Sequence, residues 1–513
     1  MCLFPSCPND EPLRLDRIMT EPLLWQAVYP EIILLVMACL IALIDLGVKS
    51  AGRDLTHYLT LGSLLGLAVI LAQSATLGQS IYAFGGLVVV DDMGAWLKCF
   101  ATLAVAVTLV YGRTYARERE MLRGGELHIL SMFALLGMYV MIGGNNFLVI
   151  YLGLELLTLT SYALVALRRD SAVATEAAMK YFVLGALASG FLLYGISMLY
   201  GATGSLDLPT VFKAIATGQI HSQVLVLGVV FVVAGLAFKL GVVPFHMWVP
   251  DVYHGAPTVI TLMIGGAPKL AAFGLVMRVL VDGLLPMALD WQQMLTVLAV
   301  ASLLVGNLAA IAQTNIKRML AFSTISQMGF VLLGLLSGVV HGQPEYTANA
   351  YSSAMFYVVS YVLTTLATFG VILLLSRGGF ESEEIADFAG LNQRSPLFAA
   401  IMAICLFSLA GIPPMVGFAA KLSVLQALVA GGDAPSIALA VFAVLMSLIG
   451  AFYYLRVVKV MYFDTPITAT PVNAGADVRW LLTLNGAMVL VVGVLPGGLM
   501  NLCARAMVQA LSS

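Results

Sequence analysis

Four ionisable side chains lie deep within long apolar stretches of the sequence: Glu155, Lys239, Lys269 and Lys421. A charge at the centre of a bilayer costs about 2.5 to 3.5 kcal/mol on insertion-based scales, so an ionisable group there is a candidate functional site. Arginine keeps its proton in a protein, whereas a buried lysine can release one. A carboxylate and several lysines at this depth therefore predict reversible protonation, the chemistry of a proton carrier.

The surroundings of Glu155 strengthen this interpretation. On a helical period of 3.6 residues, Tyr151, Thr158 and Tyr162 share a face with Glu155, so we expect a polar stripe directed at neighbouring helices. We also expect Glu155 to lie close enough to Lys239 for a hydrogen-bonded or water-bridged contact. A nearby carboxylate favours the charged lysine, and moving the carboxylate away favours release of the proton.

Two apolar segments are interrupted by proline and glycine. One reads F-K-L-G-V-V-P-F-H-M-W-V-P-D-V-Y-H-G-A-P from Phe238 to Pro257, and the other reads G-I-P-P-M-V-G-F-A-A-K from Gly411 to Lys421. This composition breaks a helix, and broken backbone is tolerated at membrane depth only where protein or a water-filled cavity satisfies the freed groups. Two such helices in corresponding places of two halves are typical of an inverted-repeat transporter.

Other ionisable groups allow two interpretations each. Lys98 and Lys180 lie near helix ends, where a side chain can reach the interface, although Lys180 is also a candidate proton relay. His246 and His254 flank the first break. His246 either carries protons or caps freed carbonyls, and the roles of His254 and Lys98 stay open. Lys269 follows the sequence G-G-A-P and is expected to act as a central relay, the alternative being a structural ion pair.

The composition requires a membrane protein, because 61% of the 513 residues are apolar and 10% are charged, against roughly 25% charged residues in a soluble domain. We expect an all-α polytopic fold of about fourteen transmembrane helices, with one short β-hairpin outside the bilayer around Gly85 and Gly86. The apolar runs are 25–47, 57–77, 92–111, 127–143, 145–167, 175–200, 222–246, 257–281, 291–313, 319–340, 350–376, 395–430, 436–462 and 478–505.

We expect the chain to divide into five regions. They are a disordered tail (1–22), helices 1 to 3 with the hairpin (23–126), a first five-helix repeat (127–282), a second, inverted repeat (290–462) and a C-terminal helix (478–513). An odd number of crossings per repeat inverts the second copy. The tail lacks an apolar run of signal-peptide length, and the sequence from Met19 reads as a complete start.

The distribution of basic residues predicts the orientation. With the N-terminus outside, the inner loops carry three times as many lysines and arginines as the outer segments, which places both termini on the outer, periplasmic side of what we expect to be a bacterial inner membrane. The outer segments contain Arg14, Arg17, Lys213, Arg278 and Arg505. The basic residues inside predicted spans are all lysines: Lys98, Lys180, Lys239, Lys269 and Lys421.

Several classes of function are excluded. The six cysteines form no C-x-x-C motif and no set with metal-ligand spacing. The polar connections are too short for a flavin or nucleotide domain, and neither a dinucleotide fingerprint nor a P-loop is present. A pI near 6.3 gives no basic field for nucleic acid. We therefore expect no cofactor in this chain, no metal site and no nucleic-acid partner.

Three stretches resemble a known family, the antiporter-like membrane subunits of respiratory complex I. They are Phe238 to Thr258, the sequence Q-T-N-I-K-R-M-L-A-F-S-T-I-S-Q-M-G from Gln313 to Gly329, and Gly411 to Lys421. The likeness extends over essentially the whole chain after Met19. The form P-D-V-Y-x-G-A-P-T is similar to the N-type branch, whereas the L and M types typically read P-D-A-x-x-x-G-P-T-P.

The resemblance implies one proton channel per subunit, with Glu155 paired to Lys239, Lys269 as central relay and Lys421 near the outer exit. It also implies that NADH, flavin, iron-sulfur clusters and quinone belong to partner subunits, and that the chain contacts other membrane subunits and the lipid bilayer. The alternative is a cation/proton antiporter subunit of a related multi-subunit antiporter or membrane-bound hydrogenase. The two share the buried residues, so the sequence separates them only through the N-type motif.

Overall fold

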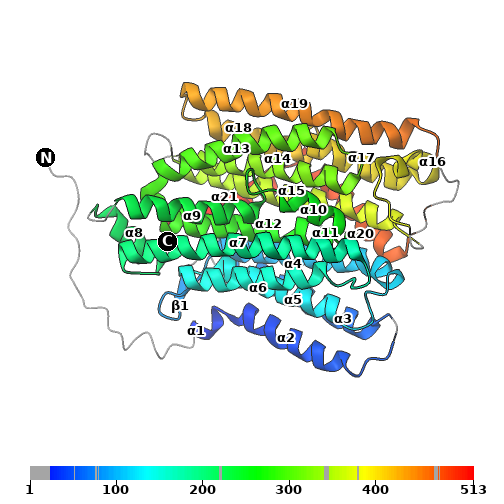
Figure 1. Cartoon of the computed structure of the whole chain (residues 1–513), viewed down its shortest axis with the longest axis horizontal. Coiled ribbons are helices and arrows are strands. Elements are labelled where there is room, and N and C mark those ends of the chain that lie inside the picture. The colour runs from blue at the N-terminus through cyan, green and yellow to red at the C-terminus, as the bar shows by residue number, and fades with distance from the viewer. Residues whose placement is uncertain are drawn as a thin grey trace.

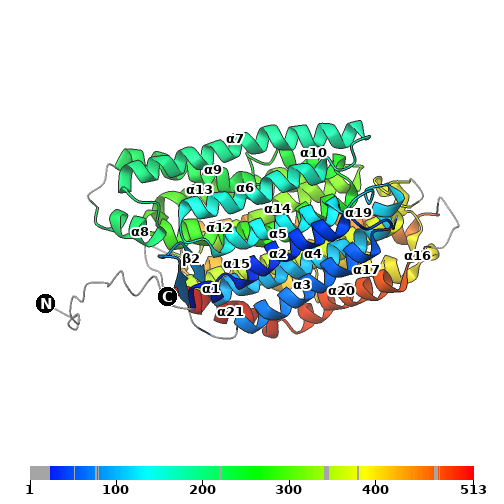
Figure 2. The same cartoon turned by 90° about the horizontal axis from the view of Figure 1, so that it is seen from below.

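The computed structural model describes residues 23–50, 52–75, 78, 80–218, 222–339, 346–377, 380–466, 472 and 474–512. The predicted N-terminal tail, with Cys2 and Cys7, lies outside the described residues. The helices run side by side along the long axis of one bundle (Figures 1 and 2). This arrangement confirms the predicted helical membrane fold.

The N-terminal part packs four helices around a small hairpin. Strands β1 and β2 pair antiparallel, with Ile81 opposite Val90, so the predicted hairpin is confirmed. The Asp91 side chain caps the next helix by accepting a hydrogen bond from the Gly94 nitrogen at 2.8 Å. The elements are α1 (Leu23–Gln26), α2 (Tyr29–Asp45), α3 (Asp54–Ser74), β1 (Ile81–Ala83), β2 (Val88–Val90) and α4 (Asp92–Glu118).

The first half of the remaining chain contains the first interrupted helix. The predicted segment 222–246 ends as an α-helix at Leu240, and a second short helix begins at Trp248. The next segment is also divided, at Gly266, and it ends in a π-helix, Met277–Gly283. The elements are α5 (Glu126–Gly143), α6 (Phe147–Val165), α7 (Ala172–Thr203), α8 (Leu208–Ala216), α9 (Ser222–Leu240), α10 (Trp248–Gly255), α11 (Thr258–Gly265) and α12 (Ala267–Val276).

The second half contains the second interrupted helix, as predicted for 395–430. The predicted single helix 478–505 is wrong, because the chain leaves the helix at Leu495 and resumes after Pro496, which has no N–H to donate. The elements are α13 (Ala288–Ile311), α14 (Ile316–Leu336), α15 (Thr347–Leu375), α16 (Leu391–Arg394), α17 (Pro396–Ala410), α18 (Val416–Val429), α19 (Ala434–Phe463), α20 (Ala476–Val494) and α21 (Gly497–Leu511), with 3-10 turns at Leu285–Met287 and Ile385–Phe388.

Among the described residues, twelve helices are long and apolar enough to cross a membrane. The halves of the second interrupted helix are shorter, and α2 has 17 residues. The chain is therefore a multi-pass membrane protein, while the count of fourteen spans stays a prediction.

The two halves share equivalent local features. Asn146 and Asn315 each cap a helix and each form an isolated β-bridge, to Asp207 and Glu384 respectively. These two partners begin short helical connectors. The connector with α8 lies at one end of the bundle, and the connector with α16 lies at the opposite end (Figures 1 and 2). Equivalent connectors at opposite ends are what an inverted repeat requires.

Close helix contacts follow the same register. A Cβ at Gly137 would lie 2.5 Å from the Leu157 nitrogen, and a Cβ at Gly306 would lie 2.8 Å from the Ser326 nitrogen. Each glycine therefore lets α5 approach α6, or α13 approach α14, at backbone distance, as small residues do in membrane helix pairs.

We predict that Gly306→Ala lowers the stability of the folded chain by about 1 to 3 kcal/mol, because the new methyl meets backbone atoms that cannot move aside. Gly62→Ala is the matched control, since Gly62 is also helical and a Cβ there meets nothing within 4 Å. Thermal unfolding of both purified variants measures the difference. Equal midpoints for the two variants would contradict the packing argument.

Candidate functional site

The end of α9 and the middle of α6 bring the first pair of candidate residues together. Lys239 Nζ donates a hydrogen bond to Thr158 Oγ1 at 2.7 Å rather than to Glu155. The Glu155 carboxylate, one turn before Thr158 on the same face, interacts electrostatically with Lys239, and its Oε1 is buried without a hydrogen-bond partner among the described residues. The two side chains therefore share a site, in which they interact electrostatically while the lysine bonds the threonine hydroxyl.

The polar stripe of α6 faces α7, as predicted. The Tyr162 ring packs edge-on against Tyr181 at 4.7 Å, and Tyr181 in turn stacks on Trp248 of α10 at 4.7 Å. A small hollow of about 10 Å³ beside Lys239 and Thr158 is lined by Gly185, Ser189 and other α7 residues, a size close to what one water molecule occupies.

Lys269 contacts the other side of the first break. The chain leaves α9 through Gly241, which has a φ of +80°, a conformation that glycine adopts without strain. Lys269 Nζ donates to the freed Leu240 carbonyl at 2.9 Å and lies 5.5 Å from the Trp248 ring centroid. Because the C-terminus of a helix is the negative end of its dipole, this carbonyl favours the charged lysine.

Lys421 has the equivalent surroundings at the second break. The chain leaves α17 through Gly411 at a φ of +84°. Lys421 Nζ donates to the carbonyls of Leu409 and Ala410, both at 3.0 Å, and to Ser447 Oγ at 2.8 Å. Each break therefore presents its freed carbonyls to a buried ammonium group.

The two candidate lysines of the interrupted helices are not counterparts in register. Lys239 lies two residues before Gly241, where the second half has Leu409 before Gly411. Lys421 lies ten residues after Gly411, where the first half has Asp251. Both ammonium groups nevertheless lie at their respective breaks.

A cluster of hydroxyl and amide groups adjoins Lys421. Gln327 Nε2 donates to the same Leu409 carbonyl at 3.0 Å and to the Tyr454 hydroxyl at 3.0 Å. Tyr357 donates to Gln327 Oε1, and Tyr454 bonds Ser323 at 2.5 Å. Tyr357 and Tyr361 of α15 therefore face α14, where they bond Gln327 and Thr324.

The remaining sequence candidates lie closer to one end of the bundle. Lys180, with its side chain about half exposed, pairs with Asp251 at 2.9 Å and with Glu176 at 3.0 Å. His246 lies in the first break, and its Nδ1 has no partner among the described residues. His254 Nε2 lies 3.7 Å from Glu383. The structure thus places all three near α10 and away from the Lys269 carbonyl contact.

The expectation that only lysines are buried is wrong. Arg278, taken from the sequence as an outer loop residue, lies in the π-helix with 2% exposure. Its guanidinium bonds Asp91 at 2.8 Å and Asp282 at 3.0 Å. The helical span continues to Gly283, past the predicted end of the run 257–281, so Arg278 belongs to the buried span and not to an outer loop. Lys98 is likewise buried in an ion pair, with Glu31 at 2.6 Å.

Sequence reasoning gave no role to Trp248, Gln327 or Ser447. The Trp248 indole donates to the Phe238 carbonyl at 3.0 Å, and its ring packs over the Lys269 ammonium group at the first break. A glutamine within an apolar run was the available signal for Gln327. Nothing in the sequence marked Ser447 as a site residue, because single serines are common in membrane helices. Among the described residues, no group of three or more His, Cys, Asp or Glu is placed to hold a metal ion.

Comparisons with known proteins agree on one family. The model for "NADH:quinone oxidoreductase/Mrp antiporter, TM" matches residues 144–450. The chain is 66% identical over 497 residues to NADH-quinone oxidoreductase subunit N of Polaromonas naphthalenivorans, covering 96% of this chain and 99% of that one. It is 60% identical to subunit N of Herminiimonas arsenicoxydans, with 95% and 98% covered.

Solved structures share the fold. A chain of respiratory complex I from Thermus thermophilus with bound aureothin is 30% identical with a TM-score of 0.76, covering 93% of this chain and 99% of that chain. A chain of the Mrp complex from Dietzia sp. DQ12-45-1b, with 20% identity and a TM-score of 0.82 over 95% and 99%, is similar in fold.

The partners of the buried cations predict opposite effects on stability. Lys421→Met removes a buried charge and leaves Leu409 and Ala410 with their bonds from Gln327 and Ser447, so stability should stay equal or rise. Arg278→Met leaves the buried Asp91 and the partly exposed Asp282 without a cation and should cost about 3 to 5 kcal/mol. Thermal unfolding of both variants tests the contrast, and a comparable loss for Lys421→Met would refute it.

Proposed function

Because this chain belongs to the NADH:quinone oxidoreductase/Mrp antiporter membrane family, on its subunit N branch, we propose that it translocates protons as subunit N of an NADH-quinone oxidoreductase. One observation carries the proposal. The ammonium groups of Lys239, Lys269 and Lys421 rest on a hydroxyl or on freed helix carbonyls. Among the described residues, no carboxylate pairs with any of them within 4 Å, so none is locked by a salt bridge.

The first step takes place at Glu155 and Lys239. When the carboxylate approaches, it stabilises the ammonium form, and when the carboxylate withdraws, the lysine retains only the Thr158 hydroxyl as its partner. In the structure the lysine is bound to the hydroxyl, which is the arrangement from which a proton can leave. Movement of the carboxylate therefore acts as the switch.

The second step passes the proton inward to Lys269. The charge of Lys239 acts on Lys269 as a like charge, and two unit charges about 8 Å apart repel by about 2 kcal/mol at an effective dielectric constant near 20. A membrane potential costs about 2.3 kcal/mol per charge per 100 mV. The repulsion is large enough to order the transfers but too small to drive pumping, so the energy comes from redox chemistry in partner subunits.

The proposed arrangement of the chain follows from the shared register. Residues 127–282 and 290–462 form the two inverted repeats, preceded by 23–126 and followed by 478–513. Inner-side arginines support the orientation with both termini outside, because Arg119 and Arg168 meet Glu381 at one end of the bundle, at 2.5 and 3.5 Å. We place the chain in a bacterial inner membrane, beside the other antiporter-like subunits of the complex.

Glu155→Gln and Lys239→Ala should each reduce proton translocation more than they reduce assembly of the complex. Both variants remove one member of the switch without opening a packed interface. NADH-driven proton uptake by membrane vesicles, normalised to NADH oxidation, measures the effect. Lys213→Ala, an exposed lysine of α8, is the control that should pump normally. Normal pumping by Glu155→Gln would remove the proposed switch.

The second expectation concerns redox chemistry. We propose that flavin, iron-sulfur clusters, NADH and quinone are bound by partner subunits and that no cofactor resides in this chain. The purified chain alone should show no visible cofactor absorbance and no NADH oxidation, while the complete complex shows both. A stoichiometric chromophore retained on the isolated chain would refute this assignment.

A further inference from the structure

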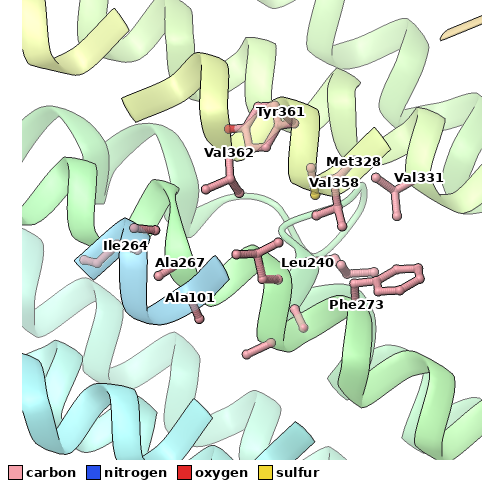
Figure 3. Packing of buried hydrophobic residues seen from close by; sticks show 14 of the residues in the cluster. Ala101, Leu240, Ile264, Ala267, Phe273, Met328, Val331, Val358, Tyr361 and Val362 are labelled. Carbon is pink, nitrogen blue, oxygen red and sulfur yellow. The ribbon is translucent and has the colours of Figure 1, made fainter. Parts of the chain in front are cut away.

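An apolar layer separates Lys269 from the polar groups of the second half. Figure 3 shows Leu240, Ala267 and Phe273 of the first half facing Val358 and Val362 of α15 across this layer. All five are buried, and α12 packs against α15 along it. A proton that leaves Lys269 toward Lys421 must therefore pass from one half to the other beside these apolar side chains.

The Tyr253 hydroxyl lies within this boundary. Tyr253 belongs to α10, the short half of the first interrupted helix, and has no exposed surface. Its ring packs edge-on against Phe369 at 6.5 Å. A Cβ built at Gly265 would lie 3.0 Å from the hydroxyl oxygen. Gly265 ends α11, and Lys269 follows four residues later, after the break at Gly266, so the hydroxyl lies beside the break at which the helix of Lys269 begins.

The same hydroxyl reaches the second half. Thr324 of α14 lies within hydrogen-bonding reach of it, although in an orientation that completes no hydrogen bond, and Tyr361 of α15 is an electrostatic neighbour. Thr324 and Tyr361 bond each other at 2.8 Å. Tyr361 lies beside Val362 on the α15 side of this contact (Figure 3). Yet the Tyr253 oxygen forms no hydrogen bond within the described residues. A buried polar group left unpaired costs about 1 to 3 kcal/mol, so its retention calls for a reason.

We propose that the Tyr253 hydroxyl is a proton relay between Lys269 and the Thr324–Tyr361 pair. This inference rests on the proposed function and adds a residue to its path. In each passage the oxygen accepts a proton from the Lys269 side and releases its own hydroxyl proton toward Thr324, then rotates back. Tyrosine is unchanged at the end, and no net charge stays on it.

The surroundings of Tyr253 explain why a tyrosine is suited to relay protons at this point. Its hydroxyl stands on a rigid ring fixed by Phe369, and its main-chain carbonyl accepts a hydrogen bond from Thr261 at 2.9 Å. The oxygen is thereby held at the boundary while its proton remains free to turn. An unpartnered hydroxyl is also the condition under which rotation breaks no existing bond.

The test compares Tyr253→Phe with Tyr351→Phe in the complete complex. Both tyrosines are fully buried, and both hydroxyls lack a hydrogen bond among the described residues. Tyr351 packs against Gly338 and does not lie between Lys269 and the Thr324–Tyr361 pair. Phenylalanine keeps the ring in each case, so a purely structural role predicts similar small effects for both variants.

We expect Tyr253→Phe to lower NADH-driven proton uptake per NADH oxidised by about ten-fold, less than the roughly hundred-fold or more of a fully lost proton-transfer group, because water can partly substitute. Tyr351→Phe should pump normally, and the two variants should unfold at similar temperatures. Normal pumping by Tyr253→Phe, or an equal loss in both variants, would overturn the inference.

A parallel Lys269→Met variant separates the two levels of proposal. If Lys269→Met abolishes pumping while Tyr253→Phe pumps normally, the relay through Tyr253 fails and the proposed function stands. If Lys269→Met itself pumps normally, the proposed function fails at its central residue. The solvent deuterium isotope effect on pumping provides a further readout, because it should change in Tyr253→Phe and stay unchanged in Tyr351→Phe.

Discussion

The contact between a buried ammonium group and the carbonyls of an interrupted helix is the interaction on which the rest of the structure depends. A charge at membrane depth needs a partner, and a helix that ends inside the bundle provides unpaired carbonyls at the negative end of its dipole. Lys269 uses the end of α9, and Lys421 uses the end of α17. Without the breaks these lysines would lack their carbonyl partners, and without Lys269 the freed Leu240 carbonyl would lose its ammonium donor.

The two halves use this device with different side chains, and the difference gives the path a direction. Where the first half has Glu155 and Thr158 on α6, the second has Thr324 and Gln327 at the same distances from the capping asparagine of α14. At these aligned positions, only the first half therefore has a carboxylate that can switch a lysine. On the proposed path, the second half receives protons through hydroxyl and amide groups that carry no charge, which would place control at the first half.

The sequence predicts the elements better than the contacts. Insertion cost identified the buried lysines, and proline and glycine content identified both breaks, because these signals are local in the chain. The partner of Lys239 could not be predicted, since Glu155 and Thr158 share one face and only the packing of α6 on α9 and α7 selects the threonine. Arg278 was missed because hydropathy places the end of a span, whereas a π-helix turns the last residues inward.

The type of partner sorts the buried cations into two groups. Arg278, Lys98 and Lys317 each bond a carboxylate, at 2.8, 2.6 and 2.8 Å. Separating such a buried pair costs about 3 to 5 kcal/mol, so these ion pairs fix the packing. Lys180 has the same kind of partner, in Asp251, so it resembles the fixed group more than a relay.

Lys239, Lys269 and Lys421 bond neutral oxygen atoms instead. A hydrogen bond from a charged donor to a neutral acceptor contributes about 1.5 to 3 kcal/mol, which is comparable to one transfer against the membrane potential. A carrier must bind its proton strongly enough to take it up and weakly enough to pass it on. Neutral partners meet both conditions at once. A carboxylate that approaches and withdraws meets them one after the other, so in the proposed mechanism one mobile carboxylate is enough to control the cycle of proton uptake and release.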